Sequence, residues 1–427
     1  MSFQRVLVIG YVWPEPTSSA AGGHMMQLLQ CFTTQGWHVT FASPARVGEH
    51  KADLAALGIA ERAIELNDDS FDRFVAELQP DMVLFDRFMM EEQFGWRVEQ
   101  HCPQAVRVLE TCDLQSLRDA RQGLLKQRLH ASDDENDFSA LFAEAPDTLY
   151  AHMSDADITQ REVAAIFRCD LSLMISPFET QLLTERFGVP ASLLHDCPLM
   201  VEPPATAALT FEQRANFVCI GNFRHAPNWD AVLWLKQQVW PRIRKQLPRA
   251  QLHVHGAYTP PKATALHNPA QGFLVKGWAM DALQVVGQAR VALAPLRFGA
   301  GIKGKLLDAM LCGTPSVTTP TGAEGMRTGE RWPGRIGRSA DELAQAAVEL
   351  YENADQWQAA HEQCHEHLGA QYATEPHAQA LILRLQQLSQ SLAQHRRANF
   401  TGSMLRHHLH KSTKYFSQWI QSKNQSV

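Results

Sequence analysis

The 427-residue chain carries a formal net charge of -6, and 45% of its residues are hydrophobic and 20% charged. This composition is typical of an ordinary globular protein and excludes a disordered or collagen-like chain. The length exceeds what one hydrophobic core usually organises, so it predicts two domains of roughly 200 residues with a ligand site between them. The acidic balance argues against a nucleic-acid partner, which needs a basic surface to neutralise phosphates.

The eight cysteines are scattered and form no CxxC pair, so a disulfide framework is not expected. The first apolar run, Val6 to Ile9, is too short for a signal peptide, and no run approaches the length of a membrane span. These features predict a cytoplasmic protein whose only contact with a membrane is peripheral, at the cytoplasmic face.

Short apolar runs alternate with helical patterns through the first half of the chain, which is the signature of βαβ units and a parallel sheet. Gly23 to Thr34 is the first expected helix. Arg118 to Thr159, which contains the acidic run SDDEND, is expected to be a helical excursion with a solvated loop. The expected strands are Val6 to Ile9, Val39 to Ala42, Met82 to Phe85, Val106 to Leu109 and Leu171 to Ile175.

The proline-bearing stretch His195 to Pro204 predicts a link to a second βα series. The expected domains are therefore 1–203, 204–376 and a tail of 377–427. The elements of the second series are strands near Phe217 and at Gln251 to Val254, Phe273 to Lys276, Val291 to Ala294 and Ser316 to Thr318, with helices at Asp230 to Gln246, Lys305 to Cys312, Asp341 to Asn353 and Gln356 to Leu368.

A glycine- and lysine-rich segment, Ala294 to Pro315, directly follows an expected buried strand. Its glycines allow the backbone to approach a ligand, and the helix that begins near Lys305 offers free N–H groups to an anion. We therefore expect a pyrophosphate cradle, whose alternative is a plain strand-to-helix turn. The cradle residues are Gly299, Gly301, Gly304, Lys303 and Lys305, with Asp308 placed to accept hydrogen bonds from a ribose.

The same glycines match GxGxxG, with Glu324 about twenty residues further on, as in a dinucleotide-binding fold. That pattern belongs after the first strand of its domain, whereas here it follows the fourth. A match to GxxxxGK fails because Leu306 stands where a P-loop needs Ser or Thr to ligate magnesium.

A second candidate segment, Gly221 to Asp230, follows the first strand of the second series. Arg224 suits bidentate contact with the same diphosphate. Pro227 and Asn228 equally fit the start of a helix.

These segments together resemble a known family. GNFRHAPNWDAVLWL, LHVHG, VKGWAMD and APLRFGAGIKGKLLDAMLCGTPSVTTPTGAEGM resemble, in that order, the donor-binding domain of retaining glycosyltransferases of family 4, the glycosyl transferases group 1. YVWPEPTSSAAGGHMMQLL, ETCDLQSLRDAR and SPFETQLL resemble the family's first domain. The resemblance implies an α/β fold of the GT-B type, in which two Rossmann-like domains have parallel sheets facing across a cleft.

The resemblance also implies residue roles. Transfer of a sugar from a nucleoside-diphosphate sugar to a hydroxyl of a glycan, lipid-linked or protein acceptor would retain configuration and need no metal or cofactor. Arg224, Lys305 and Asp113 form the implied catalytic group, since positioning and stabilisation of the departing charge do most of the work. The implied donor-binding residues are Gly22, Gly23, Lys276, Trp278, Gly299, Gly301, Lys303, Gly304, Asp308 and Glu324.

Two positions depart from the family pattern. Its pair of glutamates appears here as Ala300 and Asp308, and its Asp-x-His appears as Asp113, Leu114 and Gln115. A non-catalytic sugar-nucleotide-binding relative and an NAD-dependent oxidoreductase are therefore the alternative functions.

Two further patterns lie near the C-terminus. His361, Glu362 and His365 spell HExxH, a zinc-peptidase pattern that also arises by chance in a chain with nineteen histidines. The tail after His377 contains no Asp or Glu, and its apolar residues recur at helical spacing; it predicts either a helix on an anionic membrane, a helix packed on the first domain, or disorder. The apolar set is Leu405, Leu409, Phe416, Trp419 and Ile420, with Tyr415 beside it.

Overall fold

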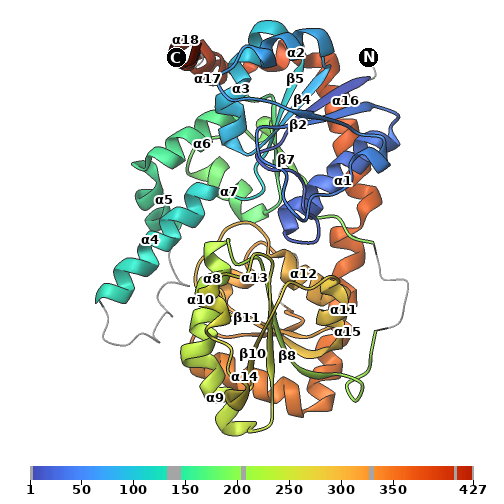
Figure 1. Ribbon diagram of the computed structural model, residues 1–427, viewed down its shortest axis with the longest axis vertical. Helices are drawn as coiled ribbons and strands as arrows, with labels where there is room; N and C mark the ends of the chain where they lie inside the picture. The colour runs from blue at the N-terminus through green and yellow to red at the C-terminus, as the bar shows by residue number, and fades with distance from the viewer. Residues whose placement is uncertain (1–2, 132–145, 203–207, 327–330, 408–410, 426–427) are drawn as a thin grey trace.

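The computed structural model describes residues 3–131, 146–202, 208–326, 331–407 and 411–425. Two α/β lobes lie one above the other, and each is built on a parallel sheet (Figure 1). The expected α/β class with two Rossmann-like domains is confirmed. The acidic run SDDEND lies outside the described residues.

The first sheet has seven parallel strands in the order β3-β2-β1-β4-β5-β6-β7. Its central strands read as continuous apolar runs because helices cover both faces. The strands are β1 (Arg5–Ile9), β2 (His38–Ser43), β3 (Ala60–Ala63), β4 (Met82–Asp86), β5 (Val106–Glu110), β6 (Leu171–Met174) and β7 (Leu194–Asp196). The helices are α1 (Ala20–Thr34), α2 (Ser70–Leu78), α3 (Phe88–His101), α4 (Gln115–Ala131), α5 (Pro146–Ser154), α6 (Asp157–Arg168) and α7 (Pro177–Glu185).

The second sheet has six strands in the order β10-β9-β8-β11-β12-β13. Trp234, Trp240 and Ile243 fill its core against β8 and β9. The strands are β8 (Ala215–Ile220), β9 (Leu252–His255), β10 (Phe273–Gly277), β11 (Ala289–Ala294), β12 (Ser316–Thr318) and β13 (Gly334–Ile336). The helices are α8 (Ala226–Trp234), which a π-helical stretch (Leu235–Val239) joins to α9 (Trp240–Gln246), then α10 (Pro261–Thr264), α11 (Ala282–Gln288), α12 (Gly304–Leu311), α13 (Pro320–Ala323), α14 (Ala340–Glu352) and α15 (Ala354–Tyr372).

Three strands depart from the expected set. The link expected at His195 to Pro204 begins later, because His195 and Asp196 complete β7 by pairing with β6. Strands β3 and β13 were not expected. Strand β3 is exposed along its whole length and has no apolar pattern, and β13 has only three residues, two of them exposed.

The last helices return to the first domain. After α15 the chain crosses back beside the first crossing, where the Val201 amide donates to the Tyr372 carbonyl at 2.8 Å. Helix α16 (Thr374–Ala398) then lays Leu381, Leu385 and Leu388 against the core of α1 and the first sheet. Figure 1 shows this long helix running from the crossing between the lobes up along the first domain.

The apolar residues of the expected tail pattern lie in the last helices. Leu405 lies in α17 (Phe400–Leu405), and Phe416 and Trp419 lie in α18 (Lys411–Gln425). Leu409 lies outside the described residues. The tail is held to the first domain, because Arg396 pairs with Asp170 at 2.7 Å. Burial opposes the shift, but the charge of Arg107 and then the hydrogen bond from Arg396 lower the pKa of that carboxyl.

Candidate active site at the domain junction

Each sheet has one point where the order of the chain reverses between neighbouring strands, and ligands of open parallel sheets bind at the carboxyl ends of such strands. In the first sheet this point lies between β1 and β4, and in the second between β8 and β11. The loop after β11 carries the expected cradle, and the loop after β1 leads into α1. These two loops meet, so the site lies at the junction of the domains.

The glycine turn packs directly against the first domain. Gly301 has φ of +63°, and a side chain there would bring a Cβ within 3.0 Å of Asp113 Cβ and Ile175 Cδ1 in the first domain. A Cβ on Gly304 would lie 2.4 Å from the Cβ of Ala20, at the start of α1. Glycine is required at both positions because first-domain atoms fill the space that a side chain would take.

The two lysines of the segment play different parts. The Lys303 ammonium is 7% exposed and donates to the Gly301 carbonyl at 2.6 Å, so it folds back on the turn. The Lys305 ammonium reaches across to the first turn of α8, where it donates to Asn228 Oδ1. Burial lowers the pKa of both lysines.

Asp308 and Glu324 occupy different surroundings. Asp308 is half-buried one turn into α12, and burial raises its pKa to about 7 against the opposing charge of Lys305. Glu324 is held by the first domain, because both of its carboxylate oxygens accept from Arg121 at 2.7 Å.

Arg224 lies on the exposed edge of the junction. Its guanidinium stacks on the Tyr258 ring at 3.5 Å, and the Tyr258 hydroxyl donates to Glu15 of the first domain at 2.7 Å. Beside it, desolvation and then the charge of Arg118 lower the pKa of His225 to about 4, so the imidazole is neutral at pH 7.

The first domain contributes the loops after β1 and β5. Ser19 caps α1 and accepts from the Gly22 amide at 3.0 Å. A Cβ on Gly22 would lie 2.4 Å from the Glu15 carbonyl, whereas Gly23 has open space around it. Asp113 pairs with Arg118 next to the glycine turn.

The expected base-binding residues lie at the end of β10. The Trp278 ring stacks on His50 of the first domain at 4.5 Å, and its indole N–H donates to the Thr17 carbonyl at 3.4 Å. Lys276 is exposed on this edge strand, away from the glycine turn.

Sequence reasoning missed four residues that join the domains: Arg121, Glu179, Glu15 and Tyr258. Arg121 and Glu179 lie inside the segments ETCDLQSLRDAR and SPFETQLL, whose resemblance to the family was the only available signal. Nothing in the sequence indicates the pairing of Glu15 with Tyr258, which are far apart along the chain.

The HExxH residues have structural contacts. His361 Nδ1 lies 2.6 Å from the Gly313 carbonyl oxygen, and its ring stacks on Trp357 at 5.0 Å. Within the described part of the chain, no three side chains of His, Cys, Asp or Glu gather as metal ligands.

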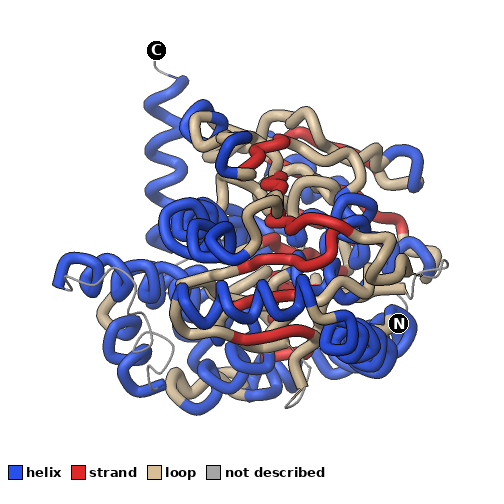
Figure 2. The backbone as a smooth tube through the Cα atoms, turned by 90° about the horizontal axis from the view of Figure 1, so that it is seen from below, coloured by secondary structure: helices blue, strands red, loops and turns tan. Residues whose placement is uncertain are grey.

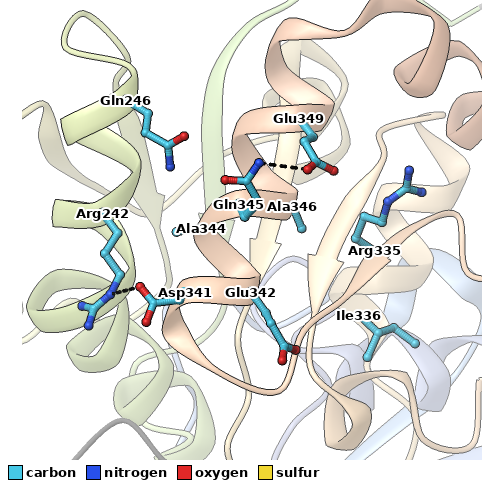
Figure 3. Close-up of a pocket in the computed structure, with 10 residues that line it drawn as sticks. All are labelled: Arg242, Gln246, Arg335, Ile336, Asp341, Glu342, Ala344, Gln345, Ala346 and Glu349. Atoms are coloured by element: carbon cyan, nitrogen blue, oxygen red, sulfur yellow. Dashed lines mark hydrogen bonds and ion pairs between the residues drawn. The ribbon is translucent and has the colours of Figure 1, made fainter.

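A hollow of about 530 Å³ lies elsewhere on the second domain, between α9, β13 and α14 (Figure 3). An ion pair between Arg242 and Asp341 at 2.7 Å closes one side of it. No expected site residue lines this hollow, so we do not assign it to the site. Its lining consists of Arg242, Gln246, Arg335, Ile336, Asp341, Glu342, Ala344, Gln345, Ala346 and Glu349.

Two Rossmann-like domains that meet at the carboxyl ends of their parallel strands form the GT-B architecture, which solved glycosyltransferase structures share. Residues 214–353 match the family described as Glycosyl transferases group 1. The matched segment includes the glycine turn, both lysines, Arg224 and Glu324. Comparison with curated protein sequences gave no match.

Solved glycosyltransferase structures share the fold over nearly the whole chain. Sucrose-phosphate synthase from Thermosynechococcus elongatus has a TM-score of 0.60 at 15% identity, covering 91% of this chain and 99% of its own. Anabaena HepE, solved with UDP and glucose, has a TM-score of 0.63 at 12% identity, covering 90% and 99%. The lipopolysaccharide outer core galactosyltransferase WaaB has a TM-score of 0.51 at 13% identity, covering 90% and 99%.

Proposed function

We propose that the protein is a glycosyltransferase that moves a sugar from a nucleoside-diphosphate sugar to a hydroxyl acceptor on a glycan, lipid or polysaccharide. The observation that carries this proposal is the glycine turn with Lys303 and Lys305 at the start of α12, at the switch point of the second sheet and facing the first domain. Backbone N–H groups, a helix N-terminus and two ammonium groups suit a diphosphate. The family match over the same segment supports the assignment.

In this proposal the donor lies on the second domain. Lys303 and Lys305 bind the diphosphate, and Asp308 binds the ribose. Trp278 and Lys276 border the base. Glu324 faces the donor sugar, together with Gly299, Gly301 and Gly304. Gly22 and Gly23 bring the start of α1 to the phosphates.

The proposed chemistry is retaining and needs no metal. The acceptor hydroxyl attacks the anomeric carbon on the face from which the diphosphate leaves, and its proton passes to the departing phosphate oxygen. Arg224 and Lys305 stabilise the developing negative charge, and Asp113 lies on the acceptor side. We also retain residues 1–203 and 204–376 as the acceptor and donor units.

Two other functions remain as alternatives. An NAD-dependent oxidoreductase rests on GxGxxG with Glu324, although that pattern belongs after the first strand of its domain and here follows the fourth, β11. A non-catalytic relative rests on Ala300 and Gln115.

The deciding experiment is a thermal-shift screen against UDP, GDP, dTDP and CMP nucleotides and NAD, followed by a transfer assay with the sugar nucleotides of the base that binds. Ligand at 100 times its Kd stabilises the folded state by about 2.7 kcal/mol, which gives a measurable shift. Stabilisation by NAD alone would contradict the proposal. Nucleotide binding without transfer or hydrolysis would favour the non-catalytic relative.

We further propose that the C-terminal helices place the enzyme on an anionic membrane surface at the cytoplasmic face. No described helix is long and apolar enough to span a bilayer. The final helix stands out from the body of the molecule (Figure 2). Together with α17, this helix exposes five large apolar side chains: Phe400 (74%), Tyr415 (65%), Phe416 (60%), Trp419 (53%) and Met404 (47%).

Charge makes an anionic lipid the occupant that fits. No acidic residue occurs between His377 and Val427, and the Lys423 ammonium lies 4.2 Å from the Trp419 ring centre. Each basic residue near an anionic surface contributes about 1 kcal/mol, which added salt weakens. Some of the tail's cations serve the fold instead, since Arg396 binds Asp170.

Co-sedimentation with phosphatidylglycerol vesicles and with phosphatidylcholine vesicles tests this surface. We expect the double variant F416S/W419S to lose binding to the anionic vesicles, while Leu57→Ser, which changes an exposed apolar side chain elsewhere, keeps it. Equal binding by the double variant and the wild type would overturn the proposal. Association of the protein with itself through this face would appear as a larger mass in the absence of vesicles.

A further inference from the structure

Glu179 is buried between the two domains. It lies in the first turn of α7, directly after β6, and none of its surface is exposed. Its Oε1 accepts from the Gly301 amide of the second domain at 2.7 Å and from the Leu114 amide of the first domain at 3.1 Å. One carboxylate oxygen therefore ties the glycine turn of the donor cradle to the loop that carries Asp113.

The other polar group of the same turn is held from the first domain as well. The Arg121 guanidinium donates to the Gly299 carbonyl at 2.9 Å while it binds Glu324. On one side of Ala300, Glu179 accepts from the Gly301 amide. On the other side, Arg121 donates to the Gly299 carbonyl. Residue 300 itself, between the two held groups, is an alanine.

Helix capping does not account for Glu179. The amides of Gln115 and Ser116 at the start of α4 are already bound by Glu162, at 2.9 and 3.0 Å. Among the described residues, Glu179 Oε2 has no hydrogen-bond partner. A buried carboxylate oxygen without a partner lowers stability, so stability alone gives no reason for an acid here.

We propose that Glu179 is a positioning residue, which fixes the donor cradle of the second domain against the Asp113 loop of the first when the domains close. This inference rests on the proposed function only for its catalytic consequence. The contact itself is a property of the closed molecule. In an open arrangement Gly301 would lose this bond, and the cradle would be free to shift relative to the acceptor side.

The charged groups around Glu179 are consistent with its proposed role of holding the glycine turn beside a bound diphosphate. Burial and then the charge of Asp113 raise the pKa of Glu179, while burial lowers the pKa of Lys303. Because a raised pKa lowers the negative charge on Glu179 at a given pH, the carboxyl repels a diphosphate less while its Oε1 accepts the Gly301 bond. The charged groups that act on this pair are Asp113, Glu324 and Arg121.

Hydrogen exchange measured by mass spectrometry tests the contact in the full-length protein without any assumption about activity. We expect Glu179→Ala to speed exchange of the Gly301 amide by about tenfold or more, because a hydrogen bond to an ionisable group is lost. Glu179→Gln keeps an acceptor oxygen and should restore protection. Glu162→Ala is the matched control: it removes an equally buried carboxylate and should speed exchange at the start of α4 but not at the glycine turn.

Steady-state kinetics then test the consequence. Glu179→Ala should lower kcat for transfer about tenfold or more, while the Kd for the nucleoside diphosphate changes by less than about threefold because the lysines remain. If Glu179→Ala does not fold, Glu179→Asp, which keeps the acid but shortens its reach, takes its place.

The proposal is overturned if Gly301 stays protected in the Ala and Asp variants, if Glu162→Ala exposes it equally, or if Glu179→Gln exchanges as fast as Glu179→Ala. Absence of transfer in the wild type would instead reject the proposed function and leave the exchange result to decide the contact.

Discussion

At the scale of single residues, Lys305 offers the sharpest test of the diphosphate site. Its ammonium is held by Asn228 Oδ1 at the switch point, within reach of a ligand between the loops after β8 and β11. We expect Lys305→Ala to weaken binding of the nucleoside diphosphate by about tenfold or more, because a charge-assisted hydrogen bond is lost. Binding of the nucleoside, which has no phosphate, should be unchanged in isothermal titration calorimetry. Equal losses for the two ligands would indicate a folding defect.

Glu162 provides a pH-dependent prediction. Burial raises the pKa of this carboxyl to about 7, although three hydrogen bonds from Gln115 and Ser116 oppose the shift. The folded-state pKa exceeds the unfolded value, so the protonated Glu162 side chain favours the folded state. Its contribution to the free energy of unfolding is complete below about pH 4.5 and is lost as the pH rises through 7.

The comparison variant is Glu162→Gln, which does not titrate. The difference in unfolding free energy between wild type and variant should fall, on the order of 1–3 kcal/mol, from pH 4.5 to pH 8. Urea unfolding at several pH values measures it. A difference that stays constant, or grows with pH, would show that the pKa of Glu162 is not raised in the folded protein.

At the scale of elements, the important contact is between the N-termini of α1 and α12. Gly304 has no side chain, and a Cβ there would meet Ala20 Cβ at 2.4 Å. We expect Gly304→Ala to hold the domains apart and lower turnover by about tenfold, since small misplacements of reacting groups are costly. Small-angle scattering should show a larger radius of gyration.

The control for this prediction is Gly23→Ala in α1, the helix whose start faces Gly304, because a Cβ on Gly23 would meet no neighbouring atom. Gly23→Ala should leave the radius of gyration unchanged. If Gly304→Ala is as compact and as active as the wild type, the two helix ends do not limit closure.

At the scale of the whole molecule, the C-terminal helices belong in part to the first domain. Helix α16 supplies Leu381, Leu385 and Leu388 to that core, so removal of residues 374–427 should prevent folding of the first domain. Removal of 411–427 alone leaves this core intact. We expect the shorter truncation to lower the melting temperature by only a few degrees and to keep nucleotide binding, as measured by differential scanning calorimetry. Loss of the folded state on the shorter truncation would make α18 a part of the core.

Local sequence was sufficient for much of the fold. Buried parallel strands such as Met82–Asp86 are nearly continuous apolar runs, and the glycines before α12 need their conformational freedom at the positions where they occur. The strand β3 was missed because an exposed edge strand carries no apolar pattern, and β7 because its two outer residues lie in a stretch that also resembles a linker.

The partners of the site residues were decided only by the tertiary structure. Glu179 and Gly301, Arg121 and Glu324, and Glu15 and Tyr258 each join segments more than a hundred residues apart. No local pattern encodes such pairs, because they form only when two separately folded sheets bring their switch points together. The same reason explains the tail. Its composition fitted a membrane helix and a packed helix equally. Only the folded first domain provides the apolar surface against which α16 packs.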